Sequence, residues 1–392
     1  MNDSKRVYDG KFDLDLWMDP VWRGSLTAYE SVMFVGKNDR VRLLYDACDI
    51  ISVRSFDLKT EYVRGVDYEY ADGRLYMPEG SGLSYIPEEL YYSKNPEFPF
   101  SIITLRDGVQ TETYFSELIC KYQVFVTYTH GEARTLFTPP DNSASFSRLL
   151  SKLENGEDAT FIFYGDSITF GASATGLLDF DPHTPIWPVM FTLKLAKKYG
   201  YTVRFVNTGL NSTGPVPAEP AVFGTNGTIT YINPAVGGWT APLGIEKYDE
   251  YVRPFIEKYG CDLFLIGFGM NDGGNSADTE KSLIAKIADS VYGQAPEAEM
   301  ILLSTMLPNP EAVNGWFGNQ HLYEAGLYEL ADEYSARGLH CAVAPMTTMS
   351  RSVLARKHFR DYCGNNVNHP NDFMVRIYAQ TVYTTVTGDF SR

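Results

Sequence analysis

Four short stretches of the chain carry the residue types that acyl-transfer chemistry needs. Ser167 stands in a Gly-Asp-Ser sequence at the end of an apolar run, and His369 lies near the C-terminus. A serine hydroxyl is a weak nucleophile until a base removes its proton, and histidine is the usual base. The tetrahedral intermediate then needs donors aimed at its oxyanion. Gly238 and Asn271 are the candidate donors, together with the backbone N–H of Ser167.

Each stretch alone has a plainer explanation. Gly-Asp-Ser is most often a turn or a helix cap, Gly237-Gly238 a bend, and Asn271-Asp272 a capping turn. A histidine followed by proline is most often a structural loop residue. The combination favours a catalytic site, because three of the stretches follow apolar runs and the fourth precedes the last expected helix. In a doubly wound sheet, such loops meet beyond the carboxyl ends of the strands.

An alternation of strands and helices from Ala159 onward is expected to position these loops. Apolar runs such as 159–165 and 261–269 indicate buried strands, and amphipathic runs such as 276–293 indicate helices. Near-continuous apolar strands that alternate with helices predict a parallel sheet covered on both faces. We therefore expect a flavodoxin-like, doubly wound α/β domain over residues 143–392.

Residues 1–142 lack this alternation of strands and helices. Runs such as 40–58 and 121–130 are rich in β-branched and aromatic residues and partly alternate, and Asp72-Gly73 between two runs predicts a two-residue hairpin. Short strands with frequent turn signals predict an antiparallel β-sandwich, jelly-roll-like in type. Pro139-Pro140 and the polar cluster after it end this region, so we place the domain boundary between residues 142 and 143.

The sequences "GDS", "AVGGWT", "GMND" and "NHPND" resemble the four blocks of the SGNH (GDSL-type) hydrolase superfamily. Ser167, Gly238, Asn271 and His369 match its four eponymous residues in order, and the resemblance covers about residues 159–392. It looks closest to a carbohydrate-active branch in which a jelly-roll domain precedes the hydrolase domain. The resemblance implies an esterase, in many members one that removes acetyl groups from sugars, and it implies no metal or organic cofactor.

One position departs from the family pattern. The family usually has Asp three residues before the histidine, where this chain has Asn366. An amide cannot neutralise an imidazolium as a carboxylate does. Three arrangements are open: a Ser–His dyad in which a backbone carbonyl orients His369, which we favour; an orienting role for Asn366; or Asp361 as the acid.

Two further residues are candidate substrate contacts. Asp166 precedes the nucleophile, and Trp239 follows the expected oxyanion glycine, although a packing role for Trp239 is about as reasonable. The stretch 177–188, which follows the nucleophile, is a candidate wall of the pocket.

The net charge, the cysteines and the histidines narrow the classes of partner, the compartment and the cofactors to be expected. The 392-residue chain has a formal net charge of −16, which argues against nucleic acid or an anionic membrane as a partner. No signal peptide is visible, and five separate cysteines without a CxxC pair favour a cytoplasmic protein, or a secreted one if a leader was removed. The histidines have no metal-ligand spacing, so we expect no metal.

These observations predict a serine esterase that hydrolyses short-chain acyl esters of carbohydrates, acetyl esters foremost, through an acyl-enzyme. One alternative is a lipase or thioesterase acting on longer acyl chains through the same residues. Another is a catalytically impaired carbohydrate-binding protein, which the missing Asp keeps open. The sugar and the oligomeric state are not determined by the sequence.

Overall fold

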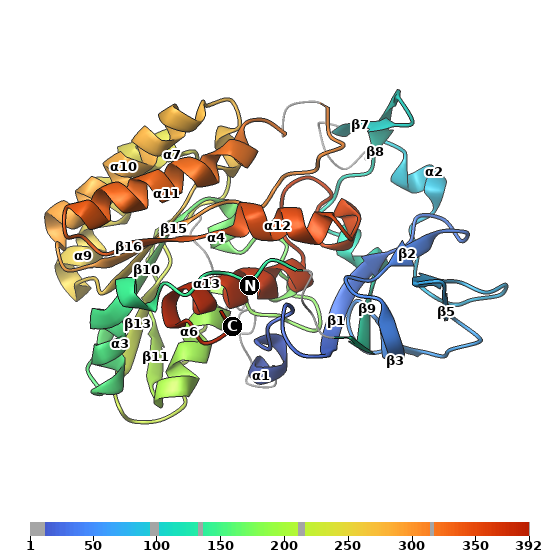
Figure 1. The fold of residues 1–392 in the computed structure, drawn as a ribbon, viewed down its shortest axis with the longest axis horizontal. Coiled ribbons are helices and arrows are strands. Elements are labelled where there is room, and N and C mark those ends of the chain that lie inside the picture. Colours follow the sequence, from blue (N-terminus) through green and yellow to red (C-terminus); the bar gives the residue numbers. More distant parts are fainter. Residues whose placement is uncertain (1–11, 95–101, 132–135, 211–215, 314–316, 392) are drawn as a thin grey trace.

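The computed structural model describes residues 12–94, 102–131, 136–210, 216–313 and 317–391. A large sheet flanked by helices forms one side of the molecule, and smaller sheets built from the N-terminal part form the other (Figure 1). The two sides meet along the first strand and the last helix of the chain.

The large sheet has seven strands and is mostly parallel. Its order is β12-β11-β13-β10-β14-β15-β16, and only the short β12 runs antiparallel to its neighbour. The six parallel strands are the ones that the apolar runs predict, so the parallel α/β sheet is confirmed. The strands are β10 (Ala159–Gly165), β11 (Thr202–Phe205), β12 (Ala221–Val222), β13 (Thr228–Ile232), β14 (Leu263–Gly267), β15 (Glu299–Leu303) and β16 (Cys341–Ala344).

The sheet is doubly wound, with the direction of winding changing at β10. Strands β13 and β11 lie on one side of β10, and β14, β15 and β16 follow on the other. The flavodoxin-like order 2-1-3-4-5 is thus extended here, because β13 is inserted between β11 and β10. Ligands of open α/β sheets bind where the winding direction changes, outside the carboxyl ends of the strands. The carboxyl end of β10 leads directly to Ser167.

Helices cover both faces of this sheet, as Figure 1 shows. Alternate side chains of β10 enter two different cores: Phe161 and Phe163 pack with α6 and α13, whereas Ile162 and Tyr164 pack with α7, α10 and α11. The helices are α3 (Ser147–Glu154), α4 (Ser167–Phe170), α5 (Thr175–Leu178), α6 (Trp187–Tyr199), α7 (Ala241–Glu246), α8 (Tyr248–Tyr251), α9 (Arg253–Tyr259), α10 (Ala277–Gln294), α11 (Gln320–Ala336), α12 (Met346–Leu354) and α13 (Asp372–Thr387), with 3-10 turns η3 (Ser143–Phe146), η4 (Met270–Asp272) and η5 (Phe359–Asp361).

The N-terminal part is built from antiparallel strands. They form a four-stranded sheet β1-β9-β3-β4, a three-stranded sheet β2-β6-β5 and the hairpin β7-β8. Asp72-Gly73 makes the predicted hairpin turn, between β5 and β6, with positive φ at both residues. The jelly-roll type itself stays a prediction. The elements are α1 (Leu14–Trp17), β1 (Leu26–Met33), β2 (Arg40–Arg42), β3 (Ala47–Ser55), β4 (Glu61–Tyr62), β5 (Glu69–Ala71), β6 (Arg74–Tyr76), α2 (Glu88–Tyr91), β7 (Ile102–Arg106), β8 (Val109–Thr113), η2 (Ile119–Tyr122) and β9 (Gln123–His130).

The two parts share one hydrophobic core. Buried side chains of β1 and β9 belong to the same cluster as those of α6 and α13. Lys357 forms a fully buried ion pair with Glu30, whose other carboxylate oxygen accepts a hydrogen bond from Tyr128 at 2.6 Å. A buried ion pair of this kind is costly to break, because one charge is left uncompensated. The N-terminal part is therefore firmly docked on the part that holds the seven-stranded sheet.

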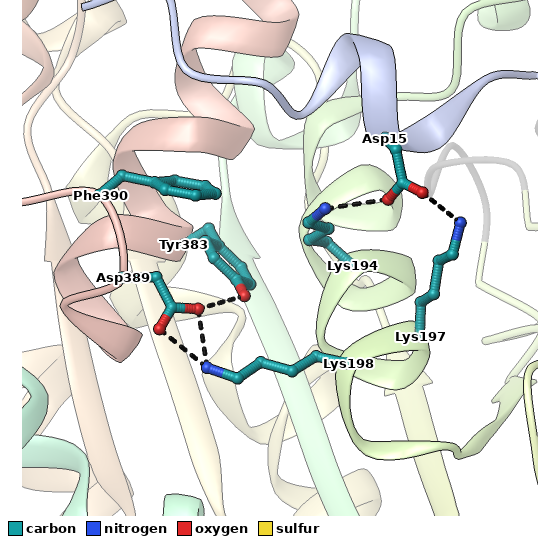
Figure 2. Close-up of a pocket in the computed structure, with 7 residues that line it drawn as sticks. All are labelled: Asp15, Lys194, Lys197, Lys198, Tyr383, Asp389 and Phe390. Carbon is teal, nitrogen blue, oxygen red and sulfur yellow. Dashed lines mark hydrogen bonds and ion pairs between the residues drawn. The ribbon is translucent and has the colours of Figure 1, made fainter. Parts of the chain in front are cut away.

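A second contact joins the two ends of the chain to α6. A pocket of about 480 Å³ lies at this contact. In it, Asp15 of α1 pairs with Lys194 and Lys197, while Asp389 pairs with Lys198 (Figure 2). Each lysine of this pocket thus has a carboxylate partner. These ion pairs hold α1 and the residues after α13 against α6.

Candidate active site

Ser167 is the first residue of α4, immediately after the central strand β10. Asp166 caps this helix, since its Oδ1 accepts a hydrogen bond from the Ile168 N–H at 2.9 Å. The chain turns so tightly against β14 that a Cβ at Gly165 would lie 2.4 Å from the Gly267 carbonyl oxygen. Only glycine fits there. The strand-to-helix turn therefore holds the Ser167 hydroxyl at the carboxyl edge of the sheet.

His369 stands beside Ser167, with 2.9 Å between His369 Nε2 and Ser167 Oγ. The loop that carries His369 is organised by one side chain. Asn365 Oδ1 accepts hydrogen bonds from the N–H groups of Val367, Asn368 and His369, at 2.9, 3.0 and 3.1 Å. Because these three donors converge on a buried oxygen, the imidazole is held in place by its own loop.

The other ring nitrogen of His369 pairs with a residue of the N-terminal part. Nδ1 lies 2.8 Å from Oε1 of Glu117, just before η2. Glu117 also accepts hydrogen bonds from Ser173 and Asn365. Burial works to raise the pKa of Glu117, but the neighbouring His369 and these hydrogen bonds outweigh it and hold that pKa below its usual range. Glu117 is therefore a carboxylate that faces the imidazole.

This contact corrects the arrangements considered for His369. The favoured backbone carbonyl is wrong, because a carboxylate occupies the Nδ1 side. Asn366 is engaged elsewhere: its Nδ2 donates to the Tyr114 carbonyl at 3.1 Å, and its Oδ1 accepts from the Tyr91 hydroxyl at 3.3 Å. Asp361 accepts hydrogen bonds from the N–H groups of Met33 and His358 instead. The sequence offered no signal for Glu117, which lies 252 residues from His369 among many other acidic residues.

The two candidate oxyanion residues lie on loops that contact each other. Asn271, in η4 after β14, donates from Nδ2 to the Trp239 carbonyl at 2.9 Å, which leaves its second amide hydrogen for another acceptor. Gly238 has a φ of +79°, and no atom lies within 4 Å of the position that a Cβ would take. A Cβ at Gly237 would lie 3.9 Å from the Ser167 Cβ. The structure thus brings all four sequence blocks together.

The candidate substrate contacts have different outcomes. Asp166 is 1% exposed and is engaged in capping α4, so a direct substrate contact is wrong for it. Trp239 is half-buried, with its ring 4.6 Å from the Tyr251 ring and 6.3 Å from the Tyr164 ring. The Trp239 side chain therefore packs against two tyrosines and keeps one part exposed beside Gly238.

Three carboxyl groups are buried at the candidate site, those of Asp166, Asp272 and Glu280. Asp272 accepts a hydrogen bond from the Ala241 N–H at 3.1 Å, which ties η4 to the loop that carries Gly238. Glu280 on α10 is 1% exposed, and its Oε1 has no hydrogen-bond partner among the described residues. Burial raises the pKa of Asp166 to about 7, of Asp272 to about 6 and of Glu280 to about 8. Burial thus shifts all three groups toward the neutral form, and among them only Glu280 has a pKa above 7.

Glu280 makes the stability of the protein pH-dependent. Its pKa is raised above the ordinary 4.5, so its neutral form contributes stability below pH 4.5, and that contribution is lost as pH rises through about 8. We expect Glu280→Gln to flatten the fall in unfolding free energy between pH 5 and 8.5, by on the order of 4 kcal/mol. Urea unfolding of both proteins at several pH values measures this. Parallel pH profiles for the two proteins would contradict it.

Among the described residues, no group of three or more His, Cys, Asp and Glu side chains is arranged to hold a metal ion. Nor does any described helix combine the length and the apolar character needed to cross a membrane.

Comparison with known proteins gives matches at the level of structure. No family model and no curated protein sequence matches the chain. A two-domain esterase active on acetylated mannans matches with a TM-score of 0.42 and 17% identity, over 62% of this chain and 53% of that chain. A carbohydrate esterase family 3 protein from Talaromyces cellulolyticus matches at 0.40 and 15%, over 57% and 94%. The acetyl xylan esterase AlAXEase matches at 0.39 and 15%, over 57% and 98%.

This chain spans about half the length of the two-domain esterase. These three structures bear the names of esterases, and the resemblance to SGNH hydrolases is carried by the four sequence blocks. The three TM-scores are below 0.5, so these likenesses assign no activity to this chain.

Proposed function

We propose that the protein is a serine esterase in which Ser167, His369 and Glu117 form a catalytic triad. The observation that carries the proposal is the continuous chain of contacts from Ser167 Oγ to His369 Nε2, at 2.9 Å, and from His369 Nδ1 to Glu117 Oε1, at 2.8 Å. A carboxylate at Nδ1 keeps the proton on that nitrogen, so Nε2 is free to accept the proton of the serine hydroxyl. The order of contacts is that of an activated nucleophile.

The reaction then follows two displacements. Ser167 attacks the ester carbonyl while His369 takes its proton, and His369 returns the proton to the departing alcohol, which leaves an acyl-enzyme. Water, deprotonated by His369, releases the acid and restores the serine. Glu117 stabilises the imidazolium in each step. The N–H groups of Ser167 and Gly238 and the Asn271 amide are the proposed donors to the oxyanion.

The N-terminal part is, in this proposal, a component of the catalytic centre. The division into residues 1–142 and 143–392, and the jelly-roll type of the first part, remain our proposals. The impaired-binding alternative loses its main support, because it was kept open by the missing Asp and Glu117 supplies a carboxylate in that place. A fluorophosphonate probe that labels the wild-type protein at Ser167 supports the esterase, and absence of labelling overturns it.

The proposed substrate is an acetylated carbohydrate. The loop that carries Gly238 and Trp239 reaches Ser167 at Gly237 and is hydrogen-bonded to Asn271. These loops offer polar groups and one half-buried aromatic ring, whereas a lipase needs a long aliphatic lining. We infer that the acyl side of the site suits a small group.

Acyl chain length tests this inference. We expect kcat/KM on nitrophenyl esters to fall at least tenfold from acetyl to octanoyl, because a long chain finds little apolar lining beside Gly238 and Asn271. The measurement is a series of nitrophenyl esters of rising chain length, run with acetylated xylo- and gluco-oligosaccharides. Equal or higher kcat/KM on octanoyl esters would favour the lipase or thioesterase.

Asn271→Ala tests the oxyanion site. Loss of one donor to the developing charge typically lowers kcat by roughly 10²–10³-fold, and we expect that effect here with little change in KM. Asn275→Ala, on the same loop, serves as a control because Asn275 binds Glu280 rather than Trp239. A change confined to KM in Asn271→Ala would assign that residue to ground-state binding.

A further inference from the structure

A second pocket lies between the N-terminal part and the loop that follows the nucleophile helix. It has a volume of about 360 Å³ and is lined by α1, β1, the turn after β3 and residues 181–183. Its volume is within the range of small-molecule sites, about 300–1,000 Å³. None of its lining residues is a proposed member of the triad or the oxyanion site. We call it the aromatic pocket.

One wall of the aromatic pocket consists of three aromatic rings that pack side by side. The Phe12 and Trp17 rings lie 5.4 Å apart with 32° between their planes, and the Trp17 and Tyr29 rings lie 5.6 Å apart with 30° between theirs. Trp17 is 2% exposed and supports the wall, while Phe12 and Tyr29 are half-buried and offer ring surface to the pocket. The apolar C–H face of a pyranose ring packs well on such a surface.

The rest of the aromatic pocket carries polar groups. Asp57 Oδ1 accepts hydrogen bonds from the Ser55 hydroxyl at 2.5 Å and the Lys59 N–H at 3.2 Å, and its carboxylate remains part of the pocket lining. Lys59 pairs with Asp181 from the opposite side, so an ion pair links the two parts of the chain at this pocket. Carboxylate and ammonium groups are the acceptors and donors that sugar hydroxyls bind.

Three lining residues of the aromatic pocket have a positive φ. Tyr29, Leu58 and His183 have φ values of +50°, +60° and +56°. For Tyr29 the cause is a register shift of β1 between Thr27 and Glu30, a β-bulge. Bulges redirect side chains and are common beside functional sites. At Tyr29 the conformation costs about 1–3 kcal/mol, and such strain clusters at ligand sites. Leu58 lies in the β3–β4 hairpin turn, and histidine adopts positive φ more readily than most residues.

The other positive-φ residues have local explanations or lie beside the candidate triad. Among the described non-glycine residues, Asp72 and Asp107 lie in hairpin turns, as Leu58 of the pocket does, and Asp179 is the left-handed C-cap of α5. Ser173 donates a hydrogen bond to Glu117, and Asn366 lies in the loop that carries His369. Tyr29 is therefore the pocket residue whose positive φ is explained neither by a turn nor by its residue type.

The loop that forms one side of the aromatic pocket is hydrogen-bonded to the segment that carries His369. Asp372, three residues after His369, accepts hydrogen bonds from the hydroxyls of Thr175 and Thr184 at 2.6 and 2.7 Å. These two threonines lie on either side of the 179–183 loop. Ser173, just before Thr175, also donates a hydrogen bond to Glu117, so this part of the chain contacts the proposed triad as well.

We propose that the aromatic pocket is a glycan subsite, which holds one sugar unit of a neutral polysaccharide whose acetylated unit reacts at Ser167. The ligand is neutral because Asp13, Asp57 and Asp181 outnumber Lys59 in the lining, so a uronate would be repelled. This proposal rests on the proposed esterase function, but the binding it describes needs no hydrolysis.

Titration calorimetry of the full chain with non-acetylated manno-, xylo- and cello-hexaose tests the subsite. We expect binding to at least one of them, weakened at least tenfold in Tyr29→Gly, which removes the ring while glycine tolerates the positive φ. The matched control is Asp107→Gly, an equivalent positive-φ replacement in the β7–β8 turn, which should bind as the wild type does. Lys59→Ala, a change at a side chain that is 64% exposed, should weaken binding without affecting folding.

The outcomes separate the two proposals. Absence of binding to all three hexaoses, unchanged binding in both Tyr29→Gly and Lys59→Ala, or tighter binding of a uronate-containing oligosaccharide would overturn the subsite. If nitrophenyl acetate is hydrolysed in the same preparation, the esterase survives that result. Hexaose binding without any hydrolysis or fluorophosphonate labelling would instead support the subsite and overturn the esterase.

Discussion

Glu117→Gln is expected to lower kcat by roughly 10²–10⁴-fold with little change in KM. The glutamine amide can donate to Nδ1 of His369, which moves the ring proton to Nε2 and leaves no acceptor for the Ser167 hydroxyl. The amide also gives no charge to stabilise the imidazolium. Steady-state kinetics on nitrophenyl acetate measures the effect, and Glu117→Asp should recover part of the activity because it restores the charge.

A pH profile separates this role from a structural one. The pKa of Glu117 is held low by His369 and its other partners, so Glu117 stays charged across the acid limb of kcat/KM and that limb reports the imidazole. In Glu117→Gln the limb should move to lower pH, because an imidazolium without its carboxylate is less stable. Unfolding alone would not move it.

Two control variants test whether a loss of kcat in Glu117→Gln is specific to the contact between Glu117 and His369. Glu89→Gln makes the same chemical change at an exposed residue of α2, and it should leave kcat unchanged. Ser173→Ala removes one hydrogen bond to Glu117 without touching the His369 contact, and it should cost less than tenfold. Activity of Glu117→Gln within threefold of the wild type would rule out the triad.

Ser167→Ala is expected to reduce kcat by more than a thousandfold and to abolish labelling by a fluorophosphonate. The hydroxyl contributes little to packing at the start of α4, so thermal unfolding should match the wild type. Members of a triad act as a unit, and the double variant Ser167→Ala/Glu117→Gln should therefore be no slower than Ser167→Ala alone. Turnover by Ser167→Ala above a thousandth of wild type would place the nucleophile elsewhere.

The parallel sheet and the four site blocks could be predicted from the sequence because their signals are local. A strand such as β10 is a continuous apolar run, and the helix that follows each strand has its own periodicity and caps, as Ser276 shows at α10. Once the strands are parallel and adjacent, their carboxyl ends share one edge. Ser167, Gly238 and Asn271 each follow such a strand, so their meeting follows from the topology.

The partner of His369 was decided by tertiary structure alone. A carboxylate needs only to reach Nδ1, and any segment that packs there can supply it, so no spacing in the chain marks Glu117. The docking of the N-terminal part fixes it: Asn371, which caps α13 two residues after His369, donates hydrogen bonds to Ser31 of β1 and Gln123 of β9, both at 2.9 Å. The local sequence determined which loops hold the proposed nucleophile, the proposed base and the candidate donors. The shared core determined which acid faces the base, because contacts between residues this distant in sequence leave no local pattern.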